Sequence, residues 1–571
     1  MMDWQKAYQK WQTHIEMDEE LRQAMANYSP EEAQEAFTGA LSFGTAGMRG
    51  ILGPGTNRMN RYTVRQATEG LAQLIIQHQA QERGVAIAYD SRHFSPEFAQ
   101  EAACVLGHHG IQVYLYERLR PTPVLSFAVR YFKAYAGIMI TASHNPAEYN
   151  GYKVYGEDGG QMPPVEAGQL MDYVSQVADP LEVATSDFDE LVASGKIKVV
   201  GDQVDQAYLD AMKSVTIDSE LIQQHQSNIS IVYTPLHGAG MYLGLKALKQ
   251  AGFEQIHVVA SQQEPDGAFP TVKSPNPESP EAFDEALKLA KEVRADIILA
   301  TDPDADRLGA MIRTATGDYQ LLTGNQIAAI MLDYLLAAAQ SQGSLPTNGV
   351  VVKSIVSTDL VRPICQHYGV EVEEVLTGFK FIAEKIKGYE QSETKQFLMG
   401  FEESYGYLIR PFVRDKDAIQ ALVVLAELTA YHQSQGRTLG DALESIYQRY
   451  GCYYEHTIAI TYPGLDGAER MRQIMAHIRQ QGPSQLGEIA IVQSDDYLTS
   501  QSMQSDGHSV PLTLPTSDAL KYHLTDGSWV ALRPSGTEPK IKLYIATKAD
   551  SMNQAEAKAQ RIEADLRTYV Q

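Results

Sequence analysis

Three strand-like apolar runs recur along this chain, and each ends in a polar loop ahead of a stretch with helical periodicity. The runs and the loops after them are Val85–Tyr89 before Asp90-Ser-Arg, Ile229–Tyr233 before Thr234-Pro-Leu-His-Gly, and Val350–Lys353 before Ser354. Alternation of such runs with amphipathic helices is typical of α/β layers with largely parallel strand pairing. The recurrence predicts an α/β fold class built from an internally repeated unit.

The length of 571 residues exceeds what one hydrophobic core accommodates, so roughly three to five domains are expected. Polar and Gly/Pro-rich stretches near Gly201, near Gly317 and around Pro463 are natural linkers. The predicted domains are 1–205, 206–316, 317–457 and 458–571. The last one is expected to be a smaller α+β cap, because it ends in a strand-like run from Ile541 and a helix rich in Ala, Glu and Arg.

Composition and charge exclude several functional classes. Apolar residues make up 44% and charged residues 21%, as in an ordinary globular enzyme. The formal net charge of −24 disfavours nucleic acid and acidic membrane surfaces as partners, because no basic patch opposes it. The three cysteines, Cys104, Cys365 and Cys452, are too few and too scattered for a disulfide framework or a zinc site, so we expect buried thiols.

Neither a signal peptide nor a membrane span is predicted. The first residues, Met1 to Lys6, lack an apolar core, and the most apolar stretch, 327–339, is interrupted by Asp333 and is too short to cross a bilayer. We therefore expect a soluble, cytoplasmic protein.

The sharpest motif is Asp302-Pro-Asp-Ala-Asp-Arg307, which follows the apolar run Ile297–Ala300. Three carboxylates at one strand end repel each other and need a compensating cation. An EF-hand would need Gly in place of Arg307 and Glu in place of Arg313, so that type of site is excluded. Three carboxylates leave positions open on a hard divalent ion, which suits Mg²⁺ that also binds a phosphate oxygen. A solvated acidic turn is the alternative interpretation.

A second strand end, Ala136–Ile140, leads into Thr141-Ala-Ser-His-Asn-Pro146, where the proline can stiffen a loop that holds a nucleophile. The loop lacks the G-x-S-x-G pattern of hydrolases. Taken alone, Ser143 is more often structural than catalytic. Its neighbour His144 is not required to face it, because adjacent side chains do not automatically point together.

Two further motifs suit an anionic, hydroxylated ligand. Arg533-Pro-Ser-Gly-Thr537 offers a guanidinium, two hydroxyls and an open glycine backbone that can surround a phosphate, although an ordinary Pro-Gly turn would look similar. Gly400-Phe-Glu-Glu-Ser-Tyr-Gly406 offers carboxylates that can accept from sugar hydroxyls.

These four motifs, in this order, resemble the α-D-phosphohexomutase family, most closely its longer bacterial phosphoglucomutases, over nearly the whole chain. The resemblance implies three related α/β domains and a C-terminal cap around a central active-site cleft. It assigns a phosphoserine loop to 141–146, a metal loop to 302–307, a sugar-binding loop to 402–404 and a phosphate-binding loop to 533–537.

The resemblance also implies roles for single residues. Arg49, within Ser42–Gly50, would contact phosphate, Lys153 would act as general acid/base, and His144 would lie among the catalytic residues. The metal would be held by Asp302, Asp304, Asp306 and a phosphate oxygen on Ser143. The implied substrate-binding residues are Arg307, Lys380, Glu402, Ser404, Arg414, Arg533, Ser535, Gly536 and Thr537. Some relatives carry a histidine after the sugar loop, where this chain has Gly406 and Tyr407, so the second acid/base group stays open.

The implied reaction interconverts glucose 1-phosphate and glucose 6-phosphate through a phosphorylated Ser143 and a glucose 1,6-bisphosphate intermediate. Its cofactors would be Mg²⁺ and glucose 1,6-bisphosphate as primer, and its partners small sugar phosphates, with the oligomeric state open. Mannose, pentose or hexosamine phosphates stay open as substrates, so that the chain could be a phosphomannomutase or phosphopentomutase. A non-catalytic sugar-phosphate-binding protein is the alternative from another class.

Overall fold

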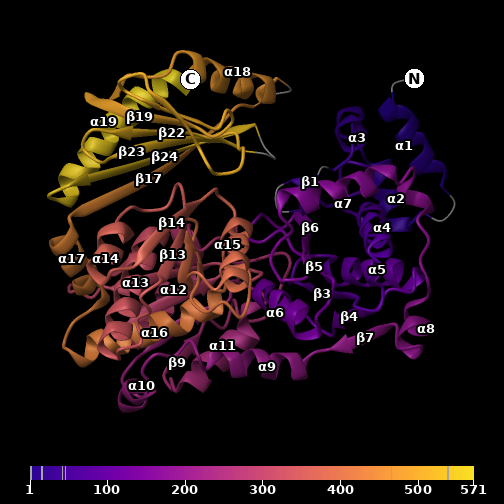
Figure 1. Cartoon of the computed structure of the whole chain (residues 1–571). Helices are drawn as coiled ribbons and strands as arrows, with labels where there is room; N and C mark the ends of the chain where they lie inside the picture. Colours follow the sequence, from indigo (N-terminus) through magenta and orange to yellow (C-terminus); the bar gives the residue numbers. More distant parts are fainter. Residues whose placement is uncertain are drawn as a thin grey trace. The chain divides into compact units, whose positions relative to one another are not determined.

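The computed structural model describes residues 3–14, 17–41, 43–44, 47–463, 466–535 and 539–570 (Figure 1). The chain forms two compact units. Unit 1 comprises Met1–Gly324, Gly378–Gly400 and Ser404–Thr438, and unit 2 comprises Asn325–Thr377, Phe401–Glu403 and Leu439–Gln571.

Unit 1 contains a seven-stranded sheet in the order β1-β2-β6-β5-β3-β4-β7. Its strands are β1 (Phe43–Gly44), β2 (Gly47–Ile51), β3 (Val85–Tyr89), β4 (Val113–Tyr116), β5 (Ala136–Ile140), β6 (Tyr149–Tyr155) and β7 (Ile197–Val200). β5, β3, β4 and β7 run parallel, whereas β6 pairs antiparallel with β5 and β2. β3 and β5 are buried along their whole length, as expected for parallel strands covered by helices on both faces.

Helices cover this sheet and an additional small core lies at the N-terminus. The helices are α1 (Asp3–Thr13), α2 (Glu19–Ala26), α3 (Pro30–Phe37), α4 (Arg61–Gln77), α5 (Ser95–His108), α6 (Thr122–Phe132), α7 (Pro164–Gln176), η1 (Pro180–Glu182) and α8 (Phe188–Ala193). α4 and α5 share one apolar core with the sheet, while α6 contacts β3 and β5 outside that core. Trp11 and Phe37 pack edge to face between α1 and α3. The result is a three-layered α/β domain.

A second sheet of unit 1 has the order β12-β11-β10-β8-β9. Its elements are α9 (Asp202–Met212), α10 (Ser219–His225), β8 (Ile231–Thr234), α11 (Gly240–Ala251), β9 (Ile256–Val258), η2 (Pro280–Phe283), α12 (Asp284–Val293), β10 (Ile297–Thr301), β11 (Leu308–Arg313) and β12 (Tyr319–Leu321). The helix α16 (Ala418–Ser434), buried along all but its last turn, packs on α11, β10 and β11. A helix from far along the chain thus completes this layer.

The third α/β region includes α13 (Gly324–Ser341), β13 (Gly349–Ser354), α14 (Val361–Tyr368), β14 (Glu371–Val375), α15 (Phe379–Ser392), β15 (Gln396–Glu402), β16 (Gly406–Leu408) and α17 (Leu439–Tyr450). Within unit 2, β13 and β14 pair in parallel. The buried Lys353 on β13 contacts Glu374 on β14 at 2.7 Å, and Lys521 of the last domain reaches the Ile355 carbonyl at 2.7 Å.

The C-terminal domain is an antiparallel sheet in the order β17-β24-β23-β22-β19-β20-β21, with β18 beside β19. Its elements are β17 (Cys452–Thr461), α18 (Gly467–Gln480), β18 (Gln485–Leu486), β19 (Ile489–Asp496), β20 (Gln501–Gln504), β21 (Ser509–Pro511), β22 (Leu520–Leu524), β23 (Trp529–Pro534), β24 (Lys540–Ala549) and α19 (Met552–Val570). β17 and β24 pair along their full length. α18 and α19 lie over this sheet and share its apolar core (Figure 1).

The predicted fold class is confirmed: three α/β regions precede an α+β domain. Strands lie where the apolar runs at Val85, Ile297 and Val350 predicted them, and the stretch 327–339 lies within α13. Across the described residues, no helix combines the length and apolarity needed to cross a membrane. Cys104 and Cys365 are buried as expected, whereas Cys452 is partly exposed, which corrects the expectation of three buried thiols.

Asp205→Asn tests the ion pair that fastens α9 to the loop after β4. Arg120 donates to both Asp205 oxygens, at 2.8 and 2.7 Å, and both residues are about 1% exposed. Breaking a buried pair leaves an uncompensated charge, so we expect unit 1 to lose about 3–5 kcal/mol and to melt earlier by thermal scanning. Asp202→Asn, at the exposed start of the same helix, is the control and should melt like wild type. Equal melting of all three proteins would contradict the role of the pair.

Candidate active site

The loop after β5 holds Ser143 in a constrained conformation. Its φ of 51° lies in the left-handed region, which is unfavourable for a residue with a Cβ. The Ser143 N–H donates to Thr141 Oγ1 at 2.8 Å, and that hydroxyl donates to Asp90 Oδ2 at 2.5 Å. The loop is therefore tied to the end of β3, and Ser143 itself is 3% exposed.

Arg92 lies against the same loop. Its guanidinium donates to four main-chain carbonyls, those of Ser143, Asn145, Pro146 and Tyr149. The side chain is 1% exposed and lies over the ring of Phe269. The sequence placed Arg92 at a strand end but indicated no role for it.

The three aspartates follow β10 on a tight turn. Asp302, Asp304 and Asp306 are buried, and one oxygen of each lies within 4.8 Å of the others. Asp302 Oδ1 accepts from the backbone N–H groups of Asp306 at 3.1 Å and Arg307 at 3.0 Å. The turn is closed by Ala305 in the left-handed region, with a φ of 50°. The loop thus points three carboxylates at one position.

The loop after β8, Thr234–Gly238, packs against this turn. A Cβ on Gly238 would lie 2.4 Å from the Cα of Pro303, so only glycine permits this contact. Ala239 N–H donates to the Pro303 carbonyl at 2.7 Å. Leu236 and His237 are both left-handed, and buried His237 lies 2.9 Å from Thr271 Oγ1. The Thr234-Pro-Leu-His-Gly loop therefore packs against the aspartate turn and stabilises it, a role that its sequence did not indicate.

The structure brings Ser143 and the aspartates together. Ser143 Oγ donates to Asp302 Oδ2 at 2.6 Å. His144 Nδ1 lies 3.2 Å from the same Oγ, so these two neighbouring side chains face each other in this structure.

Two lysines compensate the aspartates. Lys153 Nζ on β6 lies 2.9 Å from Asp304 Oδ2 and 3.7 Å from Asp306 Oδ2. Lys416 Nζ lies 3.1 Å from Asp306 Oδ2 and 3.2 Å from Asp415 Oδ1. The sequence analysis did not identify Lys416. The feature that could have indicated it is a lysine between two aspartates in Arg414-Asp-Lys-Asp.

Burial and neighbouring charges separate the ionisation of these groups. Burial, reinforced by the charges of Asp304 and Asp306, raises the pKa of Asp302 well above its ordinary value. Burial alone would also raise the pKa of Asp304, but the Lys153 ammonium and the hydroxyl of Thr122, 2.8 Å away, lower it. Of these two carboxylates, Asp302, beside Ser143, is therefore the one whose ionisation is disfavoured.

The cluster fits a divalent cation. Asp304 Oδ1 and Asp306 Oδ1 are buried and, within the described part of the chain, accept no hydrogen bond, while the other oxygen of each carboxylate contacts a lysine. Buried carboxylate oxygens without donors are costly unless a cation satisfies them. Hard oxygen ligands of this kind suit a small hard metal ion.

Several other predicted residues lie near this cluster in unit 1. Arg49 on β2 donates to Asn145 Oδ1 at 2.8 Å, and Arg307 contacts Glu278 at 2.7 Å. Arg414 is fully buried, with its guanidinium directed at the Pro411 carbonyl and Glu390. The guanidinium of Arg414 thus contacts other groups of this chain in the structure.

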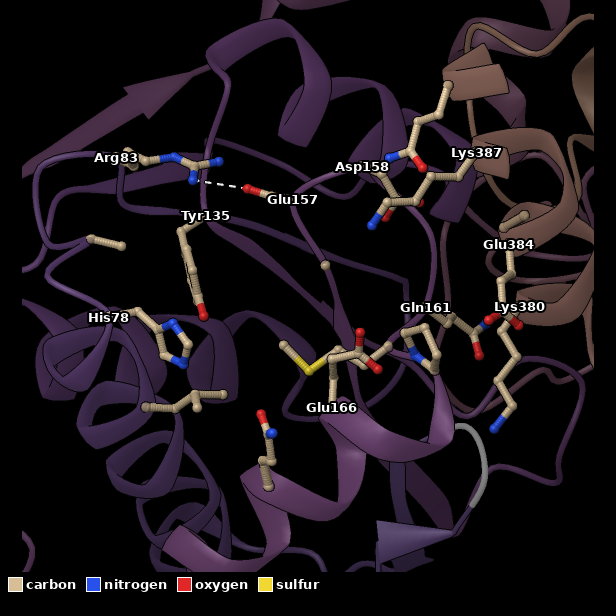
Figure 2. A pocket seen from close by; sticks show the side chains of 18 of the residues that line it. His78, Arg83, Tyr135, Glu157, Asp158, Gln161, Glu166, Lys380, Glu384 and Lys387 are labelled. Carbon is tan, nitrogen blue, oxygen red and sulfur yellow. Dashed lines mark ion pairs between the residues drawn. The ribbon is translucent and has the colours of Figure 1, made fainter. Parts of the chain in front are cut away.

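Lys380 lies on α15 and lines a cavity of about 710 Å³ (Figure 2). Burial lowers its pKa. Figure 2 shows the cavity walls with Arg83 paired to Glu157 on one side and Lys387 on the other. Neither Ser143 nor the aspartates of the 302–306 turn line this cavity.

In unit 2, the predicted sugar and phosphate residues are partly described. Glu403 Oε2 accepts from Ser354 at 3.0 Å and Ser357 at 3.3 Å, so this carboxylate anchors the loop, whereas Glu402 is buried at the end of β15. Arg533 lies at the end of β23, and Ser535 N–H donates to the Lys540 carbonyl at 2.7 Å. Gly536 and Thr537 lie outside the described residues. Ser404, in unit 1, is partly exposed.

Comparison with known proteins covers nearly the whole chain. Family models for phosphoglucomutase/phosphomannomutase match with alpha/beta/alpha domain I at residues 40–179, domain II at 206–317, domain III at 323–450 and the C-terminal domain at 479–564. A phosphoglucomutase of Staphylococcus epidermidis is 41% identical over 531 residues, covering 92% of this chain and 94% of that protein. A Staphylococcus aureus phosphoglucomutase is 39% identical over 535 residues, covering 93% and 94%.

The fold also resembles a solved structure. The open form of parafusin, a phosphoglucomutase from Paramecium, superposes with a TM-score of 0.70 at 18% identity, covering 94% of this chain and 95% of that one. At this identity the likeness shows the fold alone.

Asp304→Asn tests the cluster as a cation site. The substitution removes one of three anionic groups that lie within 4.8 Å of one another, so Mg²⁺ affinity measured by isothermal titration should fall about tenfold or more. Asp284→Asn, on the exposed start of α12, is the control and should bind as wild type does. Unchanged affinity of Asp304→Asn would place the metal elsewhere.

Proposed function

This chain belongs to the phosphoglucomutase/phosphomannomutase family, and we propose that it interconverts glucose 1-phosphate and glucose 6-phosphate through a phosphorylated Ser143. The observation that carries the proposal is Ser143 Oγ, 2.6 Å from Asp302 inside a buried cluster of three carboxylates. The phosphoglucomutases at about 40% identity over most of the chain favour glucose phosphates over pentose or mannose phosphates.

The reaction consists of two balanced transfers. In the first, the bond between Ser143 Oγ and phosphorus breaks, a bond forms to the free hydroxyl oxygen of glucose 1-phosphate, and that hydroxyl loses its proton. Glucose 1,6-bisphosphate results and then turns around. In the second, the bond between the sugar O1 and phosphorus breaks and a bond forms to Ser143 Oγ, which loses the proton that it took up in the first transfer. The O1 oxygen takes up a proton, and glucose 6-phosphate is left. Positioning and charge neutralisation are the main tasks of the protein in such transfers.

Lys153 is the proposed carrier of the sugar hydroxyl proton, because its amino group is buried beside the aspartates next to Ser143. As a neutral amine it accepts that proton in the first transfer, and as an ammonium it returns a proton to the sugar oxygen in the second. His144 is the proposed carrier of the Ser143 proton, since its Nδ1 lies 3.2 Å from Oγ. The two groups then serve the two oxygens that exchange the phosphoryl group.

Asp302, Asp304 and Asp306 are the proposed ligands of Mg²⁺, together with a phosphate oxygen on Ser143. When bound, the ion polarises the phosphoryl group and offsets its charge. Arg49, at 2.8 Å from Asn145 in the same loop, and Arg307 add positive charge around the phosphoserine.

The remaining predicted residues are assigned to the substrate. Glu402 and Ser404 are proposed to hold sugar hydroxyls, and the proposed phosphate and sugar contacts also include Lys380 and Arg414. The second phosphate is assigned to Arg533, Ser535, Gly536 and Thr537. We also propose glucose 1,6-bisphosphate as the primer that first loads Ser143, and domain limits at 205, 316 and 457.

Ser143→Ala should remove the phosphoryl carrier without unfolding the protein, because a small loop hydroxyl contributes little packing. Turnover of glucose 1-phosphate should fall about a thousandfold or more. Radiolabel from glucose 1,6-bisphosphate should no longer enter the protein, while the melting temperature stays unchanged. Ser91→Ala, which changes a serine after another strand of the same sheet, should still take up label. Label retained in Ser143→Ala would identify a different carrier.

Arg533→Ala should weaken binding of the second phosphate of the sugar bisphosphate. Loss of one charge-assisted contact predicts a KM for glucose 1-phosphate raised about tenfold or more, with more free bisphosphate released per turnover. Labelling of Ser143 should persist, because that step uses the other phosphate. The control is Arg561→Ala on the exposed side of α19. A KM and bisphosphate release equal to those of the control would exclude Arg533 as the phosphate holder.

A further inference from the structure

Arg92 makes an unusual set of contacts with the phosphoserine loop. The distances from its two terminal nitrogens are 2.6 Å to the Ser143 carbonyl, 2.8 Å to that of Pro146 and 2.9 Å to that of Tyr149, with a further short contact to that of Asn145. All four acceptors are main-chain oxygens. Those of Ser143, Asn145 and Pro146 lie outside helices and strands, and that of Tyr149 belongs to the first residue of β6.

We propose that Arg92 is a positioning residue that holds the phosphoserine loop in the shape from which Ser143 gives and receives the phosphoryl group. The inference rests on the proposed function of Ser143. Arg92 touches the backbone rather than the reacting oxygen, so it acts through Ser143 and is not itself a catalytic residue.

The loop needs such a restraint because its own geometry is unfavourable. Ser143 is left-handed, and three of the carbonyls that Arg92 binds, those of Ser143, Asn145 and Pro146, lie within four consecutive residues. Carbonyl dipoles that converge in this way repel each other unless a donor lies between them. A planar guanidinium with several N–H groups can serve all of them at once, whereas a lysine ammonium offers three donors from a single point.

Phosphorylation makes the restraint more important. In the unphosphorylated protein, Ser143 Oγ–H donates to Asp302 Oδ2 at 2.6 Å, and that bond helps to hold the loop. The phosphoserine has no such proton and carries up to two negative charges, so the same contact becomes repulsive. The bonds from Arg92 go to main-chain oxygens and do not depend on the state of the Ser143 side chain. They can therefore keep the loop in place through both halves of the cycle.

Arg92 is itself fixed from several sides. Its Nε lies 3.5 Å from Asp90 Oδ2, and its guanidinium carbon lies 5.0 Å from the centre of the Phe269 ring. Asp90 accepts from the Arg92 N–H at 2.9 Å and from Thr141, so one carboxylate joins the arginine to the start of the loop. A Cβ on Gly267 would lie 2.5 Å from the His93 backbone nitrogen, which shows how closely the Phe269 segment packs on this region.

Arg120 provides a matched control. It is as buried as Arg92, binds a carboxylate and lies over the Tyr116 ring at 5.4 Å, but its guanidinium contacts Asp205 rather than the loop. Arg92→Ala and Arg120→Ala should both lower thermal stability. Only the first should change the chemistry.

The test uses full-length protein loaded with radiolabelled phosphate on Ser143 and mixed rapidly with glucose 1-phosphate. For Arg92→Ala we expect single-turnover transfer to slow about a hundredfold, as displacement of a reacting group by about 1 Å can do, with KM changed less than about threefold. Added guanidinium ion should restore at least about a tenth of the lost rate. Arg120→Ala should transfer at the wild-type rate and should not respond to guanidinium.

Arg92→Lys keeps the charge and decides the case if Arg92→Ala does not fold. It should also transfer more than about tenfold slower than wild type, because one ammonium cannot serve the same set of carbonyls. A wild-type transfer rate in Arg92→Lys, or a defect equal to that of Arg120→Lys, would overturn the proposal. Failure of the wild-type protein to take up label on Ser143 would instead contradict the proposed function.

Discussion

Electrostatic repulsion among Asp302, Asp304 and Asp306 is the constraint around which the first unit is organised. Three carboxylates buried within 4.8 Å of one another could not persist in an uncompensated interior. Lys153 comes from β6 and Lys416 from the segment before α16, so two distant parts of the chain supply the compensating charge. One oxygen each of Asp304 and Asp306 accepts no hydrogen bond from the described residues and is available to a cation, although Arg307 Nε lies 3.8 Å from that of Asp306.

The phosphoserine loop meets this cluster through another set of constraints. Ser143 is left-handed, Thr141 ties the loop to Asp90, and Arg92 binds its carbonyls. The Thr234–Gly238 loop supports the aspartate turn through a contact that only glycine allows. Backbone strain on both loops is held by packing from outside, which is the arrangement expected where a reacting group must not move.

Local motifs predicted the strands and the chemistry of single loops, because both depend on residues near in sequence. Asp302 to Asp306 could be read as a metal loop since a strand end and three carboxylates are adjacent. Arg92, Thr122 and Lys416 escaped prediction because their partners lie far away along the chain and only the fold brings them together. The sequence likewise did not indicate that Glu403, within the loop assigned to the sugar, accepts hydrogen bonds from the distant Ser354 and Ser357. The predicted limit at 457 was placed by composition, while β17 runs from Cys452 to Thr461 across that point.

The pairing of β17 with β24 determines when the last domain can form as the chain is made. β17 is synthesised well before the strand that pairs with it, because β24 begins only at Lys540. The helix α19, which packs on both strands, extends to Val570. At ordinary rates of synthesis the intervening stretch of roughly 80 residues takes several seconds to appear. During that time the apolar residues of β17 lack the strand with which they pair, and this part of the sheet closes only after β24 has been synthesised. Arg533, which we propose to bind the second phosphate, lies on β23, the strand before β24, so its surroundings are completed late in synthesis.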